Sequence, residues 1–165
     1  MPLALPRIAM HALAVASIAV GFSFGPPHIT VRPVTDPSKA TAGAVLLVET
    51  MHHTELADLT VTARAEGLVN GKRVTLPLLI TKQSVGHYAL AKQWQDGTPW
   101  VLVLTAEQGA NGSHGVAEAI VKVSSSGAFA SIDYPAAGWI DKSDVPKRVS
   151  AAEIDAALTS MVARR

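Results

Sequence analysis

The sequence contains no cysteine among its 165 residues. Without thiols the chain cannot form a disulfide, a thiolate metal site or a cysteine nucleophile. This absence does not exclude export, because disulfides are permitted rather than required outside the cytoplasm.

Charge is also scarce. Asp, Glu, Lys and Arg together make up 16% of the residues, and the formal net charge at pH 7 is +1. A nucleic-acid-binding surface needs clustered Lys and Arg, so this balance argues against nucleic acid as a partner. The charges are too few for a disordered acidic or basic tail to dominate the chain.

Established catalytic motifs are missing as well. The sequence shows no HExxH, P-loop or dinucleotide fingerprint, and no convincing general acid and base pair. Ser113 and His114 are neighbours in a Gly-rich loop, but a nucleophile and its base meet across space rather than along the chain. The flanking glycines also differ from a G-x-S-x-G elbow. We therefore expect a protein that is not an enzyme and that holds no cofactor.

The amino-terminal segment resembles a secretory signal peptide. One cation, Arg7, precedes an apolar run over residues 8–24, and small residues follow at cleavage spacings: Ala14/Ala16, Ala19/Gly21 and Ser23/Gly25. The alternative is a retained anchor that spans the membrane once, since the run is close to the length that a bilayer requires. We assign residues 1–25 to this signal peptide or anchor and predict a periplasmic or secreted protein. Contact with a membrane is expected only through this segment.

Alternation of apolar and polar residues is the clearest structural signal after that segment. Over residues 59–66 the two kinds of side chain point in opposite directions, which predicts a half-buried strand with one wet face. The apolar set is Leu59, Val61, Ala63 and Ala65; the polar set is Thr60, Thr62, Arg64 and Glu66. The following Asn70-Gly71 pair predicts a type I′ hairpin turn.

Residues 73–81 alternate again, with Val74, Leu76, Leu78 and Ile80 on one face. Pro77 places this strand at an edge or a bulge, because proline cannot donate to a ladder. Further strands are expected at residues 29–34 (an edge strand, from Pro33) and 44–50. A second hairpin should follow from residues 87–94 and 99–107, and residues 116–124 and 128–134 should supply two more strands. About seven to eight short strands without intervening helices predict an antiparallel β-sandwich over residues 26–135.

The carboxyl terminus predicts a helix. Ser150 and Glu153 form a capping box, and Val149 and Ile154 are placed to form a hydrophobic staple. Ile154, Leu158 and Met161 line one stripe, so residues 136–165 read as a linker and an amphipathic helix. We expect this helix to dock on its own domain; the alternative is a helix offered to a partner.

The central stretch resembles bacterial extracytoplasmic immunoglobulin-like modules of the YtkA/FixH/CopC kind. The matching motifs are Asn70-Gly71-Lys72-Arg73-Val74, then Gly86-His87-Tyr88, then Gly97-Thr98-Pro99-Trp100. They cover about forty of the residues. The resemblance implies an immunoglobulin-like sandwich and an accessory or binding role, in some families linked to copper. This chain departs from the copper-linked pattern because no Met-rich segment lies between Ile80 and His87.

One segment carries a dense set of metal-ligand types, Met51, His52 and His53. Imidazoles bind copper, zinc or nickel, and a thioether favours Cu(I). Adjacent residues on an extended strand point to opposite faces, so His52 and His53 would need a loop or a third ligand to chelate. A copper-binding or chaperone-like role is therefore the alternative function.

The aromatic residues Tyr88, Trp94 and Trp100 fit the core of a sandwich, where each can bury its ring while the polar atom finds a partner. The second reading is an aromatic patch exposed for a ligand. Taken together, these patterns predict a non-catalytic exported binding or accessory module of the cell envelope. Its expected partner is a protein, peptide or glycan.

Overall fold

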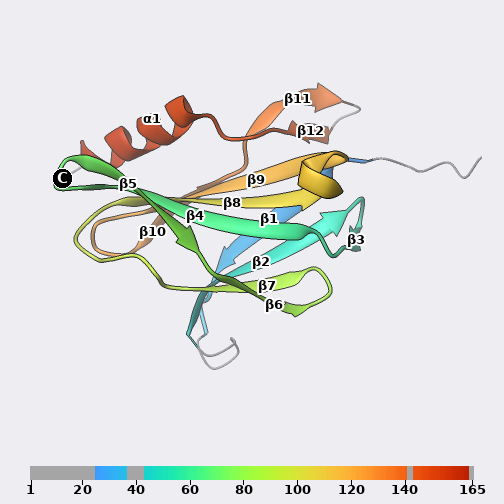
Figure 1. The fold of residues 1–165 in the computed structure, drawn as a ribbon, viewed down its shortest axis with the longest axis horizontal. Coiled ribbons are helices and arrows are strands. Elements are labelled where there is room, and N and C mark those ends of the chain that lie inside the picture. The colour runs from blue at the N-terminus through green and yellow to red at the C-terminus, as the bar shows by residue number, and fades with distance from the viewer. Residues whose placement is uncertain (1–24, 37–42, 141–142, 164–165) are drawn as a thin grey trace, which may run out of the picture.

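In the described part of the chain, two antiparallel sheets pack face to face and a helix covers the outside of one of them (Figure 1). The computed structural model describes residues 25–36, 43–140 and 143–163. The predicted mainly β, antiparallel sandwich with a carboxyl-terminal helix is confirmed. The predicted signal peptide or anchor lies outside the described residues, apart from Gly25.

Sheet A has the order β1-β2-β7-β6, with β3 paired to β2. Sheet B has the order β10-β9-β8-β4-β5. The strands of sheet A are β1 (Pro27–Pro33), β2 (Ala44–His52), β3 (Glu55–Leu56), β6 (Ile80–Ser84) and β7 (His87–Ala91). Those of sheet B are β4 (Thr60–Val69), β5 (Lys72–Leu78), β8 (Trp100–Gln108), β9 (Gly115–Val123) and β10 (Phe129–Asp133).

The remaining elements are a short turn between two strands of the sandwich, and a hairpin and a helix that follow it in the sequence. A short 3-10 turn, η2 (Ala110–Gly112), joins β8 to β9. A separate hairpin of β11 (Ala136–Ile140) and β12 (Ser143–Pro146) occupies residues that the sequence suggested were a linker. The helix α1 (Ala151–Val162) ends the described chain.

The predicted turn and edge positions are present. Asn70 and Gly71 have φ values of 51° and 74°, the left-handed conformation that a type I′ turn needs, and they join β4 to β5. Strand β5, which contains Pro77, is an edge strand of sheet B. Strand β1, which ends at Pro33, is an edge strand of sheet A.

Two of the predicted connections are wrong. Residues 73–81 are not one strand, because the chain leaves sheet B at the exposed Leu79 and continues as β6 in sheet A. The predicted hairpin of residues 87–94 and 99–107 is absent from the described chain, since β7 belongs to sheet A and β8 to sheet B. The segment between β7 and β8 instead passes from one sheet to the other, and its Trp94 is buried in the core of the sandwich. The range 26–135 therefore holds ten strands, β1 to β10, because residues 73–81 form two strands and the short β3 was not expected.

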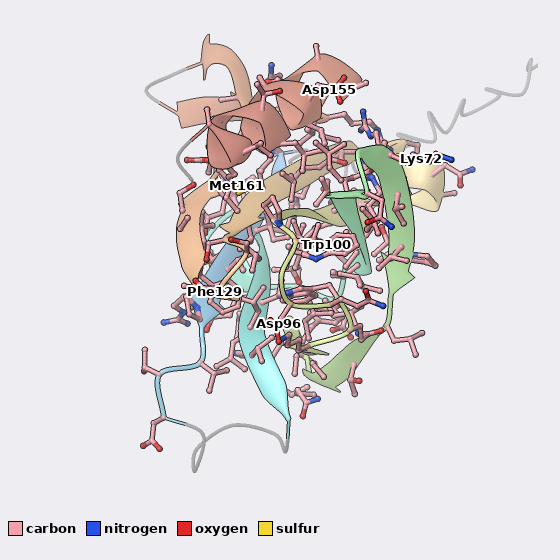
Figure 2. The ribbon with its side chains drawn as sticks, turned by 90° about the vertical axis from the view of Figure 1, so that its left-hand side faces the viewer. Lys72, Asp96, Trp100, Phe129, Asp155 and Met161 are labelled. Carbon is pink, nitrogen blue, oxygen red and sulfur yellow. The ribbon has the colours of Figure 1, made fainter. Side chains whose placement is uncertain are left out.

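The core lies between the sheets and is built from every second residue of their strands. It includes Leu46, Val48, Leu90, Trp100, Leu102, Leu104, Val121 and Val123, each no more than 1% exposed. Gly67 is required opposite Trp100, because a Cβ at this position would lie 2.5 Å from the indole ring. Figure 2 shows Trp100 between the sheets, behind the loop that carries Asp96.

A second apolar cluster forms on the outer face of sheet B. Val101, Val103 and Ile120 point away from the main core, and Ile154, Ala157 and Leu158 of α1 cover them. Val149 and Met161 pack at the margin of this cluster. The helix therefore docks on its own domain, as expected from its apolar stripe.

Two buried carboxylates flank this cluster. Glu118 accepts hydrogen bonds from the Thr105 hydroxyl (2.7 Å) and from the backbone N–H of Val149, just before α1. Glu66 is 5% exposed, although the sequence placed it on a wet face. The difference arises because cationic and hydroxyl side chains from β4 and β5 surround its carboxylate.

Burial alone would raise the pKa of Glu66. A hydrogen bond from Thr75, then the hydrogen bond and charge of Arg73 and the hydrogen bond of Arg64, outweigh burial and hold the pKa below its usual value. Arg73 also pairs with Asp155 of α1, which ties Glu66 to the helix. The carboxylate is thus kept ionised beneath the docked helix.

The start of α1 is fixed by the predicted capping box. The backbone N–H of Glu153 donates to the Ser150 hydroxyl, and the Glu153 carboxylate accepts from the Ser150 backbone N–H at 2.8 Å. Lys147 bonds the same carboxylate, and together with Ser150 it lowers the pKa of Glu153 to about 2 from an ordinary 4.5. The helix entry is therefore sensitive to acid.

We predict that Glu153→Gln lowers the melting temperature at neutral pH but not near pH 2. The folded-state pKa is depressed, so the stabilisation by this carboxylate is present above pH 4.5 and is lost as the pH falls towards 2. Melting curves of both proteins across this range measure the effect. Glu55→Gln on the exposed β3 is the control, and an unchanging gap between Glu153→Gln and the parent protein would contradict the assignment.

Candidate functional site: the open face of sheet A

The outward face of sheet A has no helix or strand over it in the part of the chain that the structure describes (Figure 1). Side chains alternate along a strand. Since Leu46, Val48 and Thr50 of β2 point into the core, the residues between and after them point outward. The residues paired with these outward positions on neighbouring strands point outward as well. We define the open face as Thr30, Arg32, Leu47, Glu49, Met51, Leu56, Ser84, His87 and Ala89.

Apolar side chains lie exposed on and beside this face. Leu47 is 36% exposed and sits between its register partners Arg32 and Ala89. Leu56, paired with Met51, is 44% exposed. Val85, in the turn between β6 and β7, is 57% exposed. Large apolar side chains at the surface are individually common, but their grouping on one uncovered sheet face marks it as a candidate contact surface.

The centre of the open face is polar. Arg32 donates to Glu49 through Nη2, and His87 Nε2 lies 3.8 Å from the same Glu49 oxygen. A shallow depression of about 260 Å³ lies here, lined by Leu47, Val48, Glu49, Gln83, Ser84, His87 and Tyr88. The Glu49 charge is balanced by Arg32, so this centre carries little net charge when His87 is neutral.

Ser84, His87 and Glu49 are residue types that can form a catalytic triad, but their geometry does not make one. Ser84 Oγ lies 3.2 Å from His87 Nδ1, and the same nitrogen lies 2.9 Å from the Val85 carbonyl oxygen. A carbonyl only accepts, so Nδ1 carries the proton and has no lone pair to take one from Ser84. The arrangement holds the His87 ring in place rather than activating a nucleophile.

The predicted metal ligands are only partly brought together. His53 has a φ of 57°, and this left-handed turn brings its ring to 4.3 Å from the His52 ring, centroid to centroid. This turn supplies the loop conformation that the two neighbouring histidines would need to lie on one side. Met51 lies on the open face, whereas His52 follows the inward set of β2.

A third ligand for this histidine pair is not evident. Among the residues that the structure describes, no three His, Asp or Glu side chains are placed to share a metal ion. His52 Nε2 is buried and has no hydrogen-bond partner within the described chain. The structure thus brings two imidazoles close together at the β2–β3 turn.

The second aromatic reading, an exposed patch of Tyr88, Trp94 and Trp100, is corrected by their burial. The three residues are 7%, 5% and 1% exposed. The Tyr88 hydroxyl donates to the Leu59 carbonyl at 2.6 Å, and Trp100 Nε1 donates to the Gln95 carbonyl at 2.8 Å. These rings hold the sandwich together and are not available to a ligand.

Sequence reasoning did not find the open face. Residues 44–50 read as a uniformly buried strand, which hid the outward positions of Leu47 and Glu49. The alternation was present in the sequence, since Leu46, Val48 and Thr50 occupy every second position. The partners from β1 and β7 could be identified only from strand register.

Among the described residues, no helix is long and apolar enough to cross a membrane. Comparison with protein families, curated proteins and solved structures finds no match for this chain. The resemblance to modules of the YtkA/FixH/CopC kind therefore stays a prediction.

Proposed function

We propose that this protein is a non-catalytic, exported binding module of the cell envelope that recognises a polypeptide partner through the open face. The observation that carries the proposal is the contrast between the two outer faces. On sheet B, α1 covers the apolar stripe. On sheet A, Leu47, Leu56 and the adjacent Val85 stay exposed around a balanced ion pair.

The shape of the open face favours a polypeptide over a small molecule. Its depression of about 260 Å³ is smaller than the roughly 300–1,000 Å³ typical of small-molecule pockets. Protein interfaces instead combine apolar contacts with polar groups on an extended, shallow surface, and they are enriched in Met and Arg. The open face supplies Met51 and Arg32 in this setting.

A binding role also agrees with the geometry of Ser84 and His87 on the open face. His87 donates through Nδ1 to a backbone carbonyl, which leaves Ser84 without a base. Export is proposed from the amino-terminal sequence, in which Arg7 precedes a long apolar run. A binding module carried outside the cytoplasm would meet envelope proteins or peptides as partners.

We predict that a photo-crosslinking amino acid at Leu47 or Leu56 captures the same discrete polypeptide from envelope extracts. The matched control is Thr60, which is exposed on a strand of sheet B. Leu47→Asp should abolish capture at position 56, because a carboxylate in an apolar contact is poorly tolerated. Circular dichroism checks that each variant is folded.

Capture of identical products at all three positions would contradict the proposal. So would the absence of a discrete product at both open-face positions, or capture at position 56 that survives Leu47→Asp.

A second candidate function, copper binding, is favoured by one observation. The His52 and His53 rings lie 4.3 Å apart, and His52 Nε2 is buried without a partner among the described residues. Two imidazoles with further ligands suit Cu(II), and a thioether would suit Cu(I). Met51 points away from this pair of histidines, which argues against a Cu(I) site that uses its thioether.

Equilibrium dialysis with Cu(II), Cu(I) and Zn(II) tests this second candidate. We expect stoichiometric Cu(II) binding that is lost in His52→Ala and retained in His114→Ala, a histidine of the β8–β9 connection. Binding at background level would reject the candidate. Binding that survives replacement of both His52 and His53 would place the metal elsewhere and would also reject it.

A further inference from the structure

A larger hollow lies on the opposite side of the molecule, beside the last turn of α1. Its volume is about 360 Å³, and its walls are Lys122, Ser124, Ser125, Ala130, Ser131, Asp133, Ser160 and Met161. Figure 2 shows Met161 on α1 above β10, the strand that begins at Phe129. This polar hollow is separate from the open face and involves none of its residues.

The hollow exists because α1 covers only part of sheet B. The helix packs on Val101, Val103 and Ile120, and Lys122 is the next outward residue of β9. Register places Ser131 beside Lys122 and Asp133 beside Ile120. Sheet residues therefore form one side of the hollow, while Ser160 and Met161 of the helix form the other.

The charged groups of the hollow neutralise each other. Lys122 Nζ lies 3.0 Å from Asp133 Oδ2, and the Ser131 hydroxyl donates to the same oxygen at 3.1 Å. An ammonium has three donors and a carboxylate about four acceptor positions, so both groups keep hydrogen-bonding capacity. The hollow thus offers donors and acceptors but no excess charge from these two residues.

Hydroxyl groups and apolar atoms complete the lining. The Ser131 and Ser160 hydroxyls already donate within the chain, to Asp133 and to the Ala157 carbonyl, so each offers a ligand acceptor positions only. Ser124 and Ser125 add two further hydroxyls to the lining. Met161 and Ala130 add apolar contact. A ligand that fits this lining has several hydroxyls around an apolar face and no net charge.

We propose that this hollow binds one neutral saccharide unit. Sugars present adjacent hydroxyls that both donate and accept, together with faces of C–H groups that contact apolar side chains. The volume is near the lower end of the range for small-molecule pockets, which favours a single unit over a long chain. Asp133, Lys122 and Ser131 bind its hydroxyls, and Met161 contacts its apolar face.

Titration of the full chain with glucose, galactose, mannose and N-acetylglucosamine, followed by amide chemical shifts, tests this site. At least one of these sugars should shift residues of β9, β10 and the end of α1 in a saturable way. Asp133→Asn should weaken binding about tenfold or more, since hydrogen bonds to charged groups are among the stronger ones, and Ser131→Ala should weaken it about fivefold through loss of a neutral hydrogen bond. Ser84→Ala removes a hydroxyl from the open face and should leave the affinity unchanged.

Several results would overturn the proposal. They are no saturable shift with any of the four sugars, shifts confined to other surfaces, or an affinity unaffected by Asp133→Asn and Ser131→Ala. Binding of glucuronate or glucosamine but of none of the neutral sugars would also overturn it. These outcomes are independent of crosslinking at Leu47, so failure here is distinguishable from failure of the proposed polypeptide recognition.

Discussion

The burial of the outer side of β8 is the constraint on which the rest of the structure depends. Trp100, Leu102 and Leu104 fill the space between the sheets, and Val101 and Val103 leave the opposite side of the same strand equally apolar. A strand that is apolar on both faces must be covered on both faces. Helix α1 supplies the second cover, and hydrogen bonds to the buried carboxylates of Glu66 and Glu118 hold its surroundings in place.

The docking of α1 on one sheet also determines which surfaces stay exposed for binding. Because α1 docks on sheet B, the sheet face that the described residues leave uncovered is that of sheet A, with Leu47 and Leu56 exposed on it. Where the helix ends, sheet B is left with the polar hollow beside Met161. The two proposed binding sites thus lie on opposite sides of the sandwich, and one partner need not displace the other.

Local signals in the sequence predicted the local structure well. The Asn70-Gly71 turn and the Ser150 capping box depend on neighbouring residues, so both could be recognised without the fold. The change of sheet at Leu79 could not, because it depends on which sheet each half of the strand pairs with. The open face was missed for the same reason, since register across β1, β2 and β7 is set by tertiary structure. Alternation alone also failed for Glu66, which is buried by partners from a neighbouring strand.

The docking of α1 is tested most directly by the free energies of unfolding of Leu158→Ala and Val162→Ala. Leu158 lies on the side of α1 that faces sheet B and is 2% exposed, whereas Val162 of the same helix is 43% exposed. Leu158→Ala should cost about 2–5 kcal/mol, as large-to-small changes in packed cores do. Val162→Ala should stay within about 0.5 kcal/mol of the parent protein. Equal small effects would mean that α1 does not cover sheet B, and the contrast between a covered and an open face would be lost.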